Sequence, residues 1–168
     1  RVNLSGEAWK EPGGGQWVES KEFDGDGFGH EGGRKIKAEG VKNPVYGTAQ
    51  QGLNAFRAIV PDGTYEVQLY FSEHWTSEPG RRLFSVFIEG KPALQPVNRF
   101  RAPGLGGPYI HKVTNVHVSD GRLDIDFVKA GEETTTIELD PVVRSLAADR
   151  ADDRGVTVGT VVVDAVEG

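Results

Sequence analysis

The sequence predicts an all-β fold, and three observations support that prediction. Residues 64–73 and 83–89 alternate apolar and polar side chains with the two-residue period of strands that bury one face. The chain contains 23 glycines and 9 prolines, which suit the many turns of an all-β protein. Long helical patterns are absent from the sequence. We therefore expect an antiparallel β-sandwich of the jelly-roll type, with long loops at one end.

The apolar runs place the expected strands in chain order. Strands are predicted at residues 1–9, 17–20, around Tyr46, and at 55–60, 64–73, 83–89, 111–118, 122–128, parts of 134–146, and 156–166. In the last of these, the run Val161–Val163 is apolar on both faces and indicates a buried strand. The Asp120-Gly121 turn predicts a hairpin between 111–118 and 122–128. Glycine-rich residues 23–33 predict no regular element, and residues 91–108 predict a long loop.

Length and composition limit the class of protein. The 168 residues predict one domain, residues 1–168, and the absence of cysteine excludes disulfides and thiolate chemistry. A net charge of −6 with interspersed signs argues against a nucleic-acid-binding protein. No apolar run approaches the roughly 18–20 residues that span a bilayer, so no membrane insertion is expected. The chain lacks methionine and begins at Arg1, so we expect a mature form or an excised fragment.

Metal and catalytic signals are weak. Asp24 and Asp26 have the spacing of the first calcium ligands of an EF-hand loop, but Lys35 stands at the twelfth position, where a glutamate is required. They predict either a structural calcium site or turn residues that bond their own backbone, and no other cofactor is expected. The four histidines have no zinc-site spacing, and no G-x-S-x-G sequence is present. Glycosidase chemistry needs two facing carboxylates, and a chain with 25 acidic residues offers such pairs by chance.

Aromatic side chains in predicted loops give the clearest functional signal. Trp75 follows a predicted strand, with Glu73, His74 and Thr76 beside it. Sugar-binding sites combine a flat ring, which stacks on C–H faces, with polar groups that bond hydroxyls. Tyr46 and Phe28 lie in other connections that could reach the same end of a sandwich. The alternative interpretation is that Trp75 and Tyr46 only pack beneath loops.

Five segments in order give a family resemblance: RVNLSG, VYGTAQ, VPDGTYEVQLYFSEHW, RRLFSVFIEGKPAL and DGRLDIDFVKAG. Over residues 1–139 the chain resembles the malectin domain, a β-sandwich that binds glucose-containing oligosaccharides. Bacterial members are appended to glycoside hydrolases. The segment from about 140 to 168 departs from the family pattern.

The resemblance implies positions for ligand contacts. It places contacting aromatics at Tyr46 and Trp75, a further aromatic near Phe28, and an acidic contact near Glu132 or Glu133. Trp75 stands where the animal lectin has tyrosine, Thr76 replaces a second aromatic, and glutamate replaces an aspartate, so a diglucose specificity does not carry over.

Together these observations predict a noncatalytic module that binds oligo- or polysaccharide. Trp75 and Tyr46 are expected to stack on sugar faces, while His74, Glu133 and His30 bond hydroxyls. The resemblance also implies a covalently linked catalytic domain and an extracellular or periplasmic location. Two alternatives stay open: a structural or interaction domain without its own sugar site, and an enzyme in its own right that uses Glu73.

Overall fold

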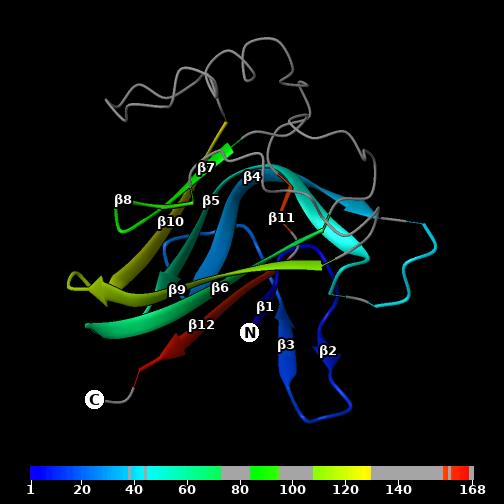
Figure 1. Ribbon diagram of the computed structural model, residues 1–168, viewed down its shortest axis with the longest axis horizontal. Coiled ribbons are helices and arrows are strands. Elements are labelled where there is room, and N and C mark those ends of the chain that lie inside the picture. Colours follow the sequence, from blue (N-terminus) through cyan, green and yellow to red (C-terminus); the bar gives the residue numbers. More distant parts are fainter. Residues whose placement is uncertain are drawn as a thin grey trace.

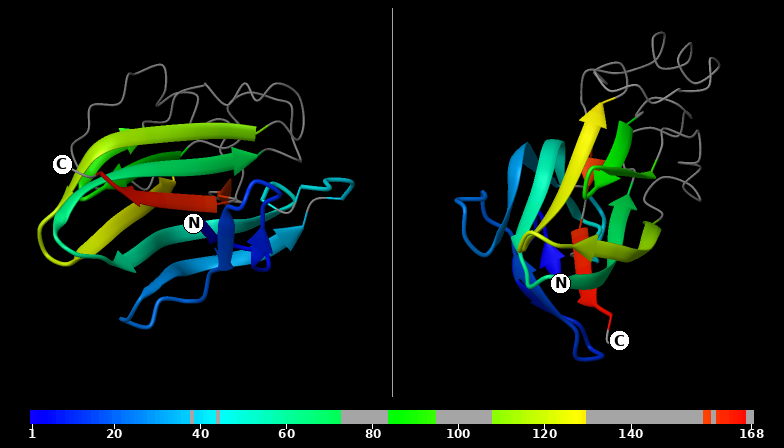
Figure 2. Two further views of the ribbon diagram at one scale, coloured as in Figure 1. Left: turned by 90° about the horizontal axis from the view of Figure 1, so that it is seen from below. Right: turned by 90° about the vertical axis from the view of Figure 1, so that its left-hand side faces the viewer.

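The described part of the chain forms two β-sheets packed face to face (Figure 1, Figure 2). The computed structural model describes residues 1–37, 39–43, 45–72, 84–94, 108–129, 157–158 and 160–166. These residues form twelve strands and no helix, and so include no helix able to cross a membrane. The predicted all-β sandwich is therefore confirmed.

The strands divide evenly between the two sheets. The first sheet contains, in spatial order, β2 (Trp9–Lys10), β3 (Gln16–Glu19), β1 (Val2–Asn3), β12 (Thr160–Ala165), β6 (Gly63–Ser72) and β9 (Pro108–Val118). The second contains β11 (Thr157–Val158), β5 (Thr48–Ile59), β10 (Arg122–Lys129), β7 (Phe84–Ile88) and β8 (Lys91–Leu94), with β4 (Phe28–Lys37) paired to β5. All pairings between the twelve described strands are antiparallel except that of β1 with β3, and a single parallel bridge joins Glu22 to His30 of β4.

The main core lies between the sheets and follows the alternation that the sequence predicts. On β6, Val67 and Leu69 are fully buried, and they share one core with Leu123 and Ile125 of β10 in the other sheet. Burying each such side chain contributes about 1.5–3 kcal/mol to folding. The rest of this core consists of Val2, Leu4, Leu53, Phe56, Ala58, Tyr65, Phe71, Phe84, Val86, Ile88, Val116, Val118 and Phe127.

The strand β12 is central to the first sheet although it lies near the end of the sequence. It pairs with β1 on one side and with β6 on the other. Val163 packs against the main core, whereas Val162 belongs to a second apolar cluster on the opposite face of the sheet. Both faces of β12 are thus covered, as its valine run predicts.

The predicted hairpin between residues 111–118 and 122–128 is wrong. β9 pairs with β6 in the first sheet, whereas β10 pairs with β5 and β7 in the second. The turn between them crosses from sheet to sheet and is held by a neighbouring turn, because Gly121 N donates to Asp62 Oδ1 at 2.9 Å and Val60 N donates to Gly121 O at 3.0 Å. A turn sequence fixes the reversal of the chain but not the strand with which each arm pairs.

Three local predictions also fail. Residues 28–37 form β4 despite their glycines, since Gly32 and Gly33 adopt positive φ angles of 69° and 87° at a bulge opposite β5. Part of the predicted 91–108 loop is the short strand β8, which pairs with β7. The residues around Tyr46 form a turn rather than a strand. The predicted strands within 134–146 lie outside the described residues.

Substitution of Gly29 tests the close approach of β4 to the preceding segment. A Cβ atom at Gly29 would lie 2.6 Å from Phe23 N and 2.7 Å from Lys21 O, both backbone atoms. Hydrogen bonds join these segments, His30 N to Lys21 O and Phe23 N to His30 O, each at 2.9 Å. We expect Gly29→Ala to lower the free energy of unfolding by about 1–3 kcal/mol in chemical denaturation.

The matched control is Gly13→Ala, because a Cβ atom there has no heavy atom within 4 Å. Its unfolding free energy should stay within about 0.5 kcal/mol of the wild type. Equal stability of the two variants would show that the contact at Gly29 relaxes without cost.

Candidate functional site

Tyr46 is positioned by a tight turn that Asn43 organises. Val45 N donates to Asn43 Oδ1 at 2.9 Å, while Tyr46 N and Gly47 N donate to Asn43 O at 3.1 and 2.8 Å. An asparagine that bonds the backbone ahead of it favours a turn over an extended strand. This is the physical reason why the predicted strand around Tyr46 does not form.

The ring of Tyr46 packs against the outer face of the first sheet. Its centroid lies 6.2 Å from that of Tyr70 on β6, with an angle of 37° between the rings. Tyr70 in turn meets Trp17 of β3 edge to face, with 5.6 Å between centroids. Burial raises the pKa of the half-buried Tyr46, and Tyr70 and Glu11 add to that shift.

These rings form the second apolar cluster of the protein. Trp17, Val45 and Val162 are its buried members, and Trp9, Tyr46 and Tyr70 pack around them. Trp17 Nε1 donates to Glu11 Oε1 at 2.8 Å, which satisfies the polar atom of the buried indole. The cluster fixes Tyr46 on the sheet face close to the end of β6, which the chain leaves after Ser72.

The sequence prediction missed Tyr70 and Trp17 as neighbours of Tyr46. The sequence gives a partial indication of Tyr70. It stands on the polar face of the alternating residues 64–73, where an aromatic side chain suggests a second apolar contact outside the core. Its meeting with Trp17, which lies more than fifty residues earlier, depends on the position of β12 in the sheet. His74, Trp75 and Glu133 lie outside the described residues, as do Glu73 and Glu132.

Phe28 does not lie at the same end of the sandwich as Tyr46. In the β4–β5 ladder, Phe28 is opposite Ala58 at one end and Lys37 is opposite Thr48 at the other. Ten residues of strand separate these ends, on the order of 30 Å along the chain. Phe28 is half-buried and packs against the main core, so the expectation that it reaches the same end as Tyr46 is wrong.

Both ring nitrogens of His30 are engaged within the protein. Nε2 lies 3.3 Å from Gln50 Nε2, an amide donor that also donates to Leu4 O at 3.0 Å. The ring nitrogen Nε2 therefore accepts, and the protonated Nδ1 lies 3.0 Å from Ser20 Oγ. This neutral ring links β4 and β5 to the segments that follow β1 and β3.

Burial lowers the pKa of His30 from its ordinary value, although the Glu22 carboxylate opposes the shift. A second proton would also place an N–H of His30 against the donating amide of Gln50. The arrangement accordingly favours the uncharged ring and makes His30 a structural residue of the β4–β5 region.

Asp24 and Asp26 bond their own loop. Asp24 Oδ1 accepts from Asp26 N at 3.2 Å, Asp26 Oδ1 accepts from Gly27 N at 2.8 Å, and Lys21 Nζ lies 2.7 Å from Asp24 Oδ2. The hydrogen bond from Lys21 is the main reason why the pKa of Asp24 is lowered. These contacts match the turn interpretation, and the described residues contain no group of three or more side chains suited to a metal ion.

Comparison with known families identifies the class of this domain. The chain matches the family model described as the malectin domain over residues 1–147. It therefore belongs to the malectin family, whose domains are carbohydrate-binding and noncatalytic.

The curated relatives that this chain matches are much longer proteins. Two probable LRR receptor-like serine/threonine-protein kinases of Arabidopsis thaliana are 33% identical over 96 residues and 30% identical over 94 residues. These matches cover 53% and 52% of this chain but 9% of each kinase. The chain thus corresponds to a small part of the curated relatives that it matches.

Solved structures share the fold. Bacteroides uniformis β-glucuronidase 2, covalently bound to cyclophellitol-6-carboxylate aziridine, superposes with a TM-score of 0.72 at 13% identity, over 99% of this chain and 17% of that chain. The plant receptor-like kinase FER superposes with a TM-score of 0.67 at 16% identity, over 98% of this chain and 41% of that chain. At these identities the likeness concerns the fold alone.

The His30 network predicts a pH dependence of stability. Because the folded-state pKa of His30 is lowered, the unfolded chain binds this proton more readily. The stabilising contribution is complete above the ordinary histidine pKa of about 6.5 and is lost as pH falls through the folded-state value. Between about pH 7 and pH 5, we expect the wild type to lose more unfolding free energy than His30→Gln.

Urea denaturation at a series of pH values measures the difference. A His30→Gln variant with the same pH dependence as the wild type would mean that the ring does not titrate with folding. The comparison uses the slope with pH, so the lower overall stability expected for the variant does not affect it.

Proposed function

We propose that this chain is a carbohydrate-binding module that recognises an oligo- or polysaccharide through Tyr46 and Trp75. The observation that carries the proposal is the placement of Tyr46 beside Tyr70, 6.2 Å apart, near the point where β6 ends. Trp75 follows Tyr70 by five residues in the sequence, so the proposal assigns both Trp75 and Tyr46 to a site at this end of β6. Membership of the malectin family supports the ligand class.

In this mechanism, Trp75 and Tyr46 stack on apolar sugar faces while His74 and Glu133 bond hydroxyl groups. His30 and Phe28 are left out, because the first has both ring nitrogens engaged and the second lies at the other end of β5. Each stacking contact contributes about 1 kcal/mol, so a dissociation constant of roughly 10 μM to 1 mM is expected. Specificity among sugars is then set by the polar groups rather than by the rings.

The module acts as part of a larger extracellular or periplasmic protein in this proposal. It directs an attached glycoside hydrolase to its substrate. The fold match to a β-glucuronidase over 17% of that chain supports an accessory role beside other domains.

A structural or interaction domain without a sugar site is the second candidate. The half-burial of Tyr46 against Tyr70 favours it, because a ring engaged in packing exposes less surface to a ligand. Under this alternative, the outer cluster stabilises the sheet, and the domain adds stability to a longer protein without binding glycans.

Trp75→Ala tests the first candidate. After a glycan array identifies a ligand, isothermal titration calorimetry should show a loss of affinity of about tenfold, because one stacking contact of about 1–1.5 kcal/mol is removed. Tyr46→Ala should weaken binding in the same direction. Phe87→Ala is the matched control, since this half-buried aromatic lies opposite Asp126 in the β7–β10 pair of the second sheet.

Full affinity in Trp75→Ala would contradict the proposed site. Absence of any glycan ligand, together with a stabilising effect of the domain in a longer protein, would favour the structural role. Glycan turnover by the purified chain that Glu73→Gln abolishes would instead identify an enzyme.

A further inference from the structure

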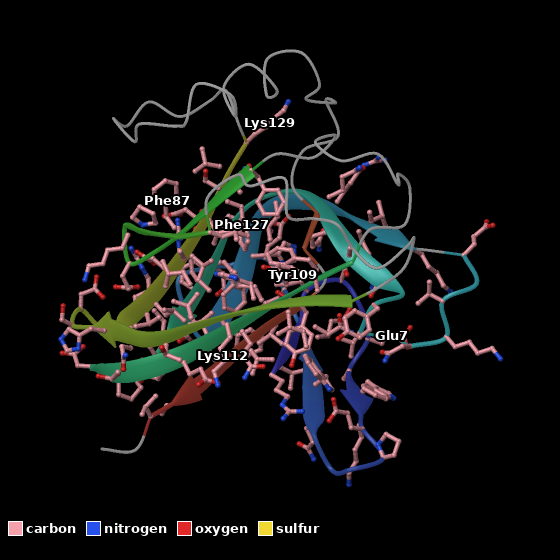
Figure 3. All side chains as sticks on the ribbon, viewed as in Figure 1. Glu7, Phe87, Tyr109, Lys112, Phe127 and Lys129 are labelled. Carbon is pink, nitrogen blue, oxygen red and sulfur yellow. The ribbon has the colours of Figure 1, made fainter. Side chains whose placement is uncertain are left out.

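A groove of about 400 Å³ lies beside the turn that carries Tyr46. Three segments distant in sequence form it: the stretch between β1 and β2, the last residues of β4, and the connection from β4 to β5. Figure 3 shows Glu7 on the first segment, close to the third. The lining residues are Gly6, Glu7, Ala8, Trp9, Lys35, Lys37, Val41, Lys42, Gly47 and Thr48.

Asparagine side chains hold two walls of the groove in place. On one wall, the fully buried Asn3 accepts from Gly6 N at 3.1 Å and donates to Glu7 O at 3.3 Å. On the other, Asn43 organises the turn that ends at Gly47. A groove with fixed walls requires little ordering when a ligand binds.

The charge of the groove is opposite to that of the whole protein. Three lysines and one glutamate line it, an excess of two positive charges in a chain of net charge −6. Lys35 has Glu19 at 3.8 Å, whereas Lys37 and Lys42 form no ion pair with any residue that the structure describes. Both ammonium groups are exposed and available to an anionic ligand.

Trp9 adds an aromatic surface to this positive region. The ring is half-buried and packs against the cluster around Trp17, its partner across the β2–β3 pair. A supported indole at the margin of a groove suits the C–H face of a pyranose. Ammonium groups and Glu7 then suit a ligand that carries both an anionic group and hydroxyls.

We propose that this groove is a second saccharide site, which selects an acidic sugar. A pyranose ring stacks on Trp9, its carboxylate or sulfate group pairs with Lys37 and Lys42, and Glu7 accepts from a hydroxyl. The choice of a saccharide, rather than another anion, rests on the function proposed above. A nucleic acid fits less well, because its many phosphates would meet the net negative charge of the rest of the protein.

Calorimetry with tetragalacturonate tests the site, with its fully methyl-esterified form as the uncharged counterpart. We expect the acid to bind at least tenfold more tightly than the ester, and the difference to shrink as sodium chloride screens the charges. The double variant Lys37→Gln/Lys42→Gln should lose about tenfold in affinity for the acid. Lys91→Gln, an exposed lysine on β8, is the matched control and should bind as the wild type does.

Further variants and ligands separate this proposal from the function above. Trp9→Leu keeps an apolar side chain but removes the indole, and it should weaken binding of the acid, whereas Trp75→Ala should leave it unchanged. A sulfated galactan oligosaccharide compared with tetragalacturonate shows whether the lysines prefer sulfate or carboxylate. Binding of either one through Lys37 and Lys42 supports the proposal.

Three results would overturn it. Equal affinity for the acid and its ester would exclude selection of the anionic group by the groove. If a neutral glycan still binds and Trp75→Ala weakens its binding, the function proposed above would stand without this second site. Displacement of tetragalacturonate by inorganic sulfate at equal concentration would indicate a simple anion site. Failure of every saccharide to bind would remove this proposal and the function above together.

Discussion

The two-residue period of β6 is the constraint on which both the core and the candidate site depend. Its inward side chains, Val67 and Leu69, are fully buried between the sheets, and the outward Tyr70 forms the base on which Tyr46 packs. A slip of one residue would exchange these faces. In a shifted β6, Val67 and Leu69 would leave the core, so such a pairing would be much less stable than the observed one. The burial of these two side chains therefore also fixes the side of the sheet on which the outer aromatic cluster forms.

Sequence patterns predict what depends on neighbours along the chain. The buried faces of β6, β7 and β10 and the valine-rich β12 follow from their alternation and apolar runs, and all lie in the core as expected. Pairing partners follow from distant residues instead. The Asp120-Gly121 turn has the chemistry of a hairpin, yet the turn at Asp62 holds it in a crossing between sheets. The glycines of β4 predict a loop from the sequence, but the strand accommodates Gly32 in a bulge opposite β5.

The same division applies to the candidate sites. Tyr46 and Trp75 were predicted from residue type and family resemblance, because an aromatic side chain in a polar connection is visible in the sequence. Trp9 was not, because its significance depends on Lys37 and Lys42, which the fold brings beside it from the end of β4 and from the connection that follows β4. Phe28 shows the converse error: this conspicuous aromatic residue in a glycine-rich segment packs against the main core instead of lying at the end of the sandwich that carries Tyr46.

The central position of β12 has a consequence for folding. Val2 pairs with Val161, and Leu69 pairs with the same residue from the other side, so the first sheet joins the two ends of the chain through its middle. Such long-range pairing raises contact order and slows folding. During synthesis, the edges of β1 and β6 that pair with β12 stay unpaired until residues 160–165 have been made. Until then their unpaired edges are open to association with other chains.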